Sequence, residues 1–165
     1  MSKFKKILLV LCAAALLLTG ALVTALAETE YTGTVEEYVA LLDAVDAAEG
    51  AVAKTEALAA ADEYFYKENS IDPYAPGRKE ALARRAQIAD ALELLKVTEA
   101  NAMLTAYAEN TTADLAARRT AIDEIKAFLD AVQIKPATEG YEAVMASYNE
   151  KLIAVQGEEI GRAHV

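Results

Sequence analysis

The scarcity of helix-breaking residues most constrains what this chain of 165 residues folds into. Proline occurs only at Pro73, Pro76 and Pro136, and there are only seven glycines. Alanine, the residue with the highest helix propensity, accounts for 31 of the 138 residues after position 27. Long stretches therefore lack any stop signal, which favours helices over strands. We expect an all-α fold: an elongated antiparallel helical bundle, or a short helical-hairpin array, of about five helices.

The spacing of apolar residues places helical segments in the first third of the chain. Thr34 and Glu37 have the spacing of a capping box, in which each side chain accepts a hydrogen bond from the other residue's amide, so a helix is expected to begin there. Its apolar positions are Val35, Tyr38, Leu41, Leu42 and Val45. Gly50 either follows the end of this helix or lies within one longer helix, at a cost of about 1 kcal/mol. Helical character resumes over 51–66.

A loop over 68–77 leads into one long helix. Turn-forming residues fill this loop, and we expect Ile71 and Tyr74 to fold onto the bundle. The helix that follows begins near Arg78 and, lacking Gly and Pro, runs for about 30 residues. The β-branched pair at 97–98 is its weakest point. The residues expected on its buried side are Leu82, Ile88, Leu92, Leu95, Met103 and Tyr107.

Two more helices are expected before the end of the chain. A turn at 110–112 precedes the first, with Asp114 favourable in its first turn. An apolar seam in steps of three and four follows and stops at Pro136. The seam consists of Leu115, Arg118, Ile122, Ile125, Leu129 and Val132. The last helix opens near Thr138, and its apolar positions are Tyr141, Met145, Tyr148, Leu152 and Val155.

Residues 1–27 have the order of a secretory signal peptide. Three lysines precede an apolar run over 7–18, and the small residues Ala25 and Ala27 stand where a signal peptidase reads. The alternative is an uncleaved membrane anchor, because 7–27 is long enough to span a hydrocarbon core of about 30 Å. We expect cleavage and a secreted or cell-surface protein.

The last seven residues, 159–165, match one reading frame of a widely used DNA-sequencing adapter. We therefore expect 159–165 to be a non-native tail and 28–158 to be a helical domain that is truncated at its C-terminus. The alternative is a genuine flexible tail.

The charge of the chain restricts its partners. All 26 acidic residues follow position 27, against 13 Lys and Arg, which gives that part a formal net charge of about −13. A chain with this negative charge is not expected to bind nucleic acid or anionic membrane surfaces. A partner attracted by the charge would be a cation or a basic protein. The alternative role of the charge is solubility. Two arginine pairs, at 84–85 and 118–119, are expected to form salt bridges with neighbouring acidic faces.

No reactive constellation is found in the sequence. Cys12 and His164 are the only cysteine and histidine, and both lie in the terminal segments that we expect to be removed or non-native. Imidazole bases, thiolate nucleophiles and the usual zinc ligands are then missing. Adjacent carboxylates such as Glu36 and Glu37 point in different directions on a helix. We predict that the chain is no enzyme and has no cofactor or metal site.

Aromatic residues gather around the 68–77 loop. Tyr64, Tyr66 and Tyr74 are a weak candidate for a patch that contacts a protein or a glycan. The alternative is that these rings belong to the edge of the core.

These observations give one leading function and two alternatives. The composition, though no motif, resembles that of helical modules near the start of large bacterial surface proteins. We expect a non-catalytic helical module of a secreted or cell-surface bacterial protein, acting as a spacer or a protein-binding unit. The alternatives are an accessory domain of a secreted enzyme whose catalytic part lies outside this fragment, and a periplasmic acidic helical chaperone.

Overall fold

The computed structural model describes residues 31–67, 70–110 and 112–163, and this part of the chain is all-α, as expected. The expected signal peptide and His164 lie outside the described residues. The five helices are α2 (Val35–Ala47), α3 (Gly50–Tyr66), α4 (Arg78–Glu109), α5 (Leu115–Val132) and α6 (Tyr141–Ala163). None of them combines the length and the apolar character that crossing a bilayer requires.

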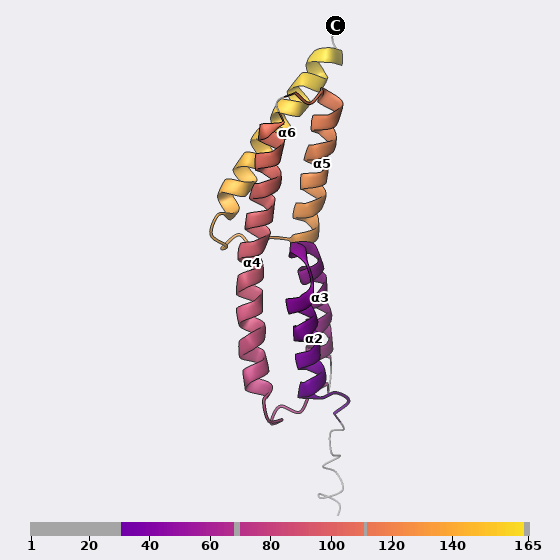
Figure 1. Ribbon diagram of the computed structural model, residues 1–165, viewed down its shortest axis with the longest axis vertical. Helices are drawn as coiled ribbons and strands as arrows, with labels where there is room; N and C mark the ends of the chain where they lie inside the picture. Colours follow the sequence, from indigo (N-terminus) through magenta and orange to yellow (C-terminus); the bar gives the residue numbers. More distant parts are fainter. Residues whose placement is uncertain (1–30, 68–69, 111, 164–165) are drawn as a thin grey trace, which may run out of the picture.

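The helices form two three-helix bundles that lie end to end and share α4 (Figure 1). Helices α2 and α3 pack on the first half of α4, and α5 and α6 pack on its second half. Successive helices run antiparallel, and α3 contacts α5 where the bundles meet. The molecule is therefore elongated, with α4 as the element common to both ends.

Helix α2 follows the sequence pattern closely. The amide of Glu37 donates to Thr34 Oγ1 (3.1 Å) and the amide of Thr34 donates to Glu37 Oε2 (3.0 Å), so the predicted capping box is confirmed. The buried residues of α2 are Val35, Tyr38, Leu42 and Val45. The ring of Tyr38 packs against that of Phe65 in α3 (centroids 4.8 Å apart), which joins the two helices of this hairpin.

The chain breaks at Gly50 and continues through Thr98. Helix α2 ends at Ala47, and Gly50 has a φ of +78°, a left-handed conformation that favours glycine. Of the two alternatives for Gly50, the helix end is therefore correct. In α4 the hydroxyl of Thr98 donates to the carbonyl of Leu94 (2.9 Å), and the helix runs unbroken past the β-branched pair.

The side of α4 that faces the core is rotated about the helix axis relative to the side that the sequence predicts. Of the six residues expected on its buried side, Leu92 is buried and the other five are half-buried at the flanks. The innermost positions are instead Ala81, Ala89, Leu92, Glu93, Lys96, Val97, Ala100 and Leu104. The reason is that α4 is wedged between two helices in each bundle, where small alanines allow the closest approach.

In the second bundle, three details of the helix ends differ from the sequence prediction. Asp114 is the N-cap of α5 rather than a first-turn residue, and its Oδ1 accepts from the amide of Ala117 (2.8 Å). Helix α5 ends before Pro136, because Gln133 adopts a left-handed φ of 49°. Helix α6 begins at Tyr141 rather than near Thr138.

The seam residues Leu115, Ile122, Ile125 and Val132 are buried, as predicted. In α6, Tyr148 and Val155 are buried as expected, whereas the fully buried Val144 was not predicted.

Candidate functional site

Tyr64 ties α3 to the start of α2. Its hydroxyl donates to Glu37 Oε2 (2.6 Å) and accepts from the amide of Thr34 (2.9 Å). The Tyr64 hydrogen bond lowers the pKa of Glu37, while burial and the Glu37 partner raise the pKa of Tyr64. A Cβ atom at Gly33 would lie 2.2 Å from Tyr64 Oη, so this contact depends on a glycine there. Tyr64 thus has a structural role at the cap of α2.

Tyr66 and Tyr74 are the exposed members of the predicted aromatic patch. Their exposed fractions are 70% and 92%, so the prediction that Tyr74 folds onto the bundle is wrong, whereas Ile71 is buried as expected. The ring of Tyr66 lies edge-on to that of Phe65 (5.2 Å), and the guanidinium of Arg78 covers the Phe65 ring at 4.8 Å. Within the described residues, the rings of Tyr64, Tyr66 and Tyr74 make no ring contact with one another.

A buried ion pair lies where the two bundles meet, and we call Glu93 and Lys96 with their partners the joint. Lys96 Nζ donates to Glu93 Oε1 (2.8 Å), and the two side chains are only 7% and 11% exposed, respectively. Glu93 Oε2 also accepts from the amide of Lys135 (2.9 Å) and the hydroxyl of Thr138 (3.2 Å). Burial acts to raise the pKa of Glu93, but the Lys135 amide and Lys96 outweigh it, so that the pKa is lowered.

Two more charged side chains form hydrogen bonds with backbone groups at helix ends near the joint. The carboxylate of Glu99 accepts from the amide of Ala51 (3.0 and 3.1 Å) in the first turn of α3. Lys54 Nζ donates to the carbonyls of Val45 (2.8 Å) and Asp46 (2.9 Å) at the end of α2. Each charge has the sign that a helix dipole favours at that terminus. The joint was not predicted from the sequence, although Glu93 and Lys96 stand next to apolar residues of α4 and this position indicated that they could be buried.

The two arginine pairs form the predicted salt bridges. Arg84 contacts Asp43 (2.7 Å) and Asp46 (2.5 Å) of α2, and Arg85 pairs with Asp62 of α3. In the second bundle, Arg118 forms two hydrogen bonds with Glu158 (2.7 and 2.6 Å). Its neighbour Arg119 contacts Asp123 (3.1 Å) within α5 and Glu159 (3.3 Å) of α6. These pairs link α4 to the first hairpin and α5 to α6.

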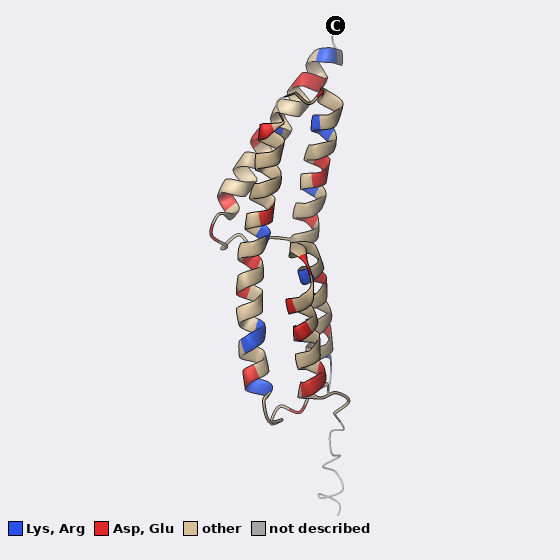
Figure 2. Cartoon of the chain, viewed as in Figure 1, with Lys and Arg blue, Asp and Glu red and all other residues tan. Residues whose placement is uncertain are grey.

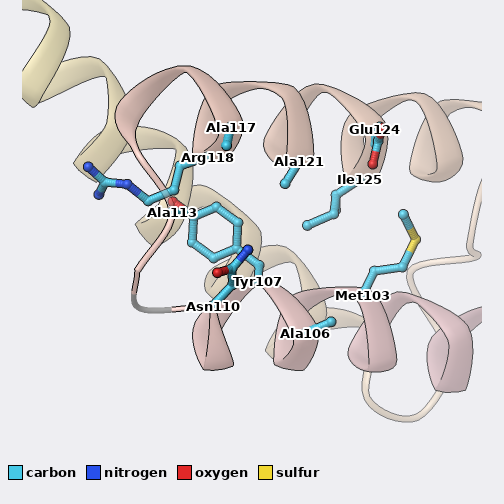
Figure 3. Close-up of a pocket in the computed structure, with 10 residues that line it drawn as sticks. All are labelled: Met103, Ala106, Tyr107, Asn110, Ala113, Ala117, Arg118, Ala121, Glu124 and Ile125. Carbon is cyan, nitrogen blue, oxygen red and sulfur yellow. The ribbon is translucent and has the colours of Figure 1, made fainter.

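A pocket of about 270 Å³ lies between α4 and α5 in the second bundle (Figure 3). Its walls are mostly apolar, with Met103, Tyr107 and Ile125 pointing into the space between the helices. Figure 3 shows the guanidinium of Arg118 turned away from these residues, toward the side where it binds Glu158. The pocket therefore offers an apolar surface and no arranged pair of acid and base.

Within residues 31–67, 70–110 and 112–163, no group of three or more His, Cys, Asp or Glu side chains is placed so that it could hold a metal ion. Comparisons of the chain with family models, with curated proteins and with solved structures gave no match.

Proposed function

We propose that this chain is a non-catalytic helical module that acts as a rigid spacer in a secreted or cell-surface bacterial protein. The observation that carries the proposal is the unbroken course of α4 through both bundles, with the joint at its middle. A spacer must resist bending, and this one has no linker at the point where its two halves meet.

The sequence of α4 supports stiffness. Sharp helix kinks arise at Pro, at Gly or Ser pairs, at π-bulges, or where a group inserts into the backbone ladder. The stretch 78–109 contains no Pro, Gly or Ser. Bending at the joint would also separate Glu93 from Lys135 and Thr138, which leaves buried polar groups without partners.

The terminal segment and the charge support the proposed setting. The signal-like order of residues 1–27 is that of exported proteins. The acidic surface keeps such a protein soluble and separate from its neighbours.

A distance measurement across the joint tests the spacer function. In a Cys12→Ser background, nitroxide labels at Lys79→Cys and Ala116→Cys would report on the two far ends, because both positions are exposed. We expect one narrow distance distribution by pulsed electron paramagnetic resonance. Adding Thr98→Pro breaks α4 at an exposed position and should broaden the distribution. A distribution that is already as broad in the parent as in the proline variant would refute a rigid spacer.

A further inference from the structure

A shallow groove between α2 and α4 in the first bundle differs in chemistry from the α4–α5 pocket. It encloses about 530 Å³. Its apolar lining consists of Val35, Val39 and Ala40 of α2, Pro76 of the preceding loop and Ala81 of α4. Of these, Val35 and Ala81 are buried in the core. Ala40 is exposed and Val39 is half-buried, so both present apolar surface to solvent. From Val35 to Asp43 the groove extends for about 12 Å along α2, which matches two turns of a helix.

The edges of this groove carry acidic side chains without partners. Glu36 on α2 and Glu80 on α4 line it, both are exposed, and neither makes an ion pair or side-chain hydrogen bond in the described structure. The third carboxylate of the lining, Asp43, is paired with Arg84. Arg84 also binds Asp46, so the single cation of the lining is already engaged.

Helix α2 strengthens the negative field along the groove. Its sequence contains four acidic residues and no basic residue. The acidic positions are red along α2 in Figure 2. A low-dielectric apolar floor beside unpaired carboxylates focuses this field on whatever binds there. A second copy of this acidic chain would meet like charges, which opposes self-association through the same groove.

From this complementarity we infer that the α2–α4 groove binds a basic amphipathic helix of another protein. The apolar stripe of such a helix would lie on Val39 and Ala40, and Lys or Arg residues on its two flanks would pair with Glu36 and Glu80. This is the helix-in-groove mode of recognition, in which apolar anchors give affinity and flanking charges give register.

The probe is a fluorescently labelled 18-residue peptide with a leucine stripe flanked by lysines, titrated against the full chain and followed by anisotropy. Two matched peptides separate the contributions: one replaces lysine by glutamate, and the other replaces leucine by glutamine. We expect saturable binding of the first peptide, and affinities at least tenfold weaker for the other two. Absence of saturable binding of the first peptide, or equal binding of the glutamine peptide, would overturn the inference.

Charge-reversal variants locate the interaction. The double variant Glu36→Lys with Glu80→Lys should weaken peptide binding at least tenfold, and Ala40→Arg should do the same by occupying the groove. The matched control, Glu63→Lys with Glu109→Lys, makes the same change in net charge at exposed acids outside the groove. The control should change the affinity less than threefold. Equal loss in both double variants would mean unspecific charge attraction and would overturn the proposal.

A photo-crosslinker at position 40 identifies the occupant directly. Because Ala40 is exposed, its replacement leaves the core of the bundle unchanged, and circular dichroism checks that each variant keeps its helical content. Crosslinking to the lysine–leucine peptide supports the inference. Crosslinking that persists in the presence of excess peptide, either to residues 1–27 of the same chain or to a second copy, would show a different occupant and overturn it.

Discussion

Single residues determine how the two bundles are held together. Glu93 has most of its hydrogen-bonding capacity filled: by Lys96 on its own helix and by Lys135 and Thr138 from the segment between α5 and α6. Removing one partner of a buried ion pair costs far more than the pair itself contributes, because the other charge stays buried without compensation.

Replacing Glu93 by alanine should therefore destabilise the chain by about 3–5 kcal/mol, measured by urea unfolding. The double variant Glu93→Met with Lys96→Leu removes both charges and should lose much less stability. A double variant as unstable as the single one would show that the hydrogen bonds to the 135–138 segment, rather than the uncompensated charge, dominate at the joint.

The pH dependence of stability follows from the lowered pKa of Glu93. A carboxyl group whose pKa is lower in the folded than in the unfolded state stabilises the fold above its unfolded value, about 4.3, and loses this contribution as the pH falls through the folded value. We expect the urea midpoint to fall below about pH 4.5, and to fall less steeply in Glu93→Gln. Parallel pH profiles for the two proteins would contradict the charged state assigned to Glu93.

Two tyrosines of the first bundle should respond oppositely to loss of their hydroxyl groups. Tyr38 is 1% exposed and its hydroxyl has no hydrogen-bond partner among the described residues, so Tyr38→Phe should leave stability unchanged or raise it by up to about 1 kcal/mol. Tyr64→Phe loses the bonds to Glu37 and Thr34 and should cost about 1 kcal/mol. Thermal unfolding of the two variants tests the pair, and a destabilised Tyr38→Phe would reveal a partner for that hydroxyl.

At the scale of the elements, local chemistry sets where each helix begins and ends. The capping box at Thr34 and the loop before Arg78 could be predicted from the sequence, and the helices follow them. At Gly50 the sequence left two alternatives open, and the left-handed φ of the structure decides for a helix end. What the sequence does not reveal is which side of α4 faces inward, because its alanines carry no strong apolar signal and its partners change halfway along. The buried pair of Glu93 and Lys96 was missed because the other partners of Glu93 come from the 135–138 segment, about 40 residues away in the sequence.

Less of the candidate binding surfaces than of the helix bounds could be predicted from the sequence. The exposed Tyr66 and Tyr74 and the arginine salt bridges come from residues that the sequence singles out. The α2–α4 groove does not, because its lining joins residues of two helices whose relative placement only packing decides. Its floor is made of Val and Ala, which read in sequence as ordinary helix positions.

Replacing Gly50 or Gly157 by alanine should change the stability of the chain in opposite directions. Gly50→Ala puts a Cβ on a left-handed residue and should cost about 1–2 kcal/mol, although the nearest Glu99 oxygen would be at an ordinary 3.6 Å. Gly157→Ala lies in α6 with open space around it and should stabilise by about 0.5–1 kcal/mol. Chemical unfolding measures both changes. If Gly50→Ala proved neutral, the break between α2 and α3 would not depend on the left-handed turn.

In the whole molecule, the shared helix α4 should make the two bundles behave as one mechanical unit. Helix α4 packs on the helices of both bundles, and its buried residues Ala89, Leu92, Ala100 and Leu104 belong to one hydrophobic core. An opening of either bundle should therefore propagate through the joint. The proposed spacer function requires this coupling rather than a particular surface of either bundle.

Native-state hydrogen exchange along α4 tests this claim most directly. The account predicts that the amides of Lys96 and Val97 at the joint open with the same free energy, within about 1 kcal/mol, as those of Ala89 and Leu104 in the two bundles. Fast exchange at the joint, together with two different opening free energies on either side of it, would show two independent bundles and contradict the account.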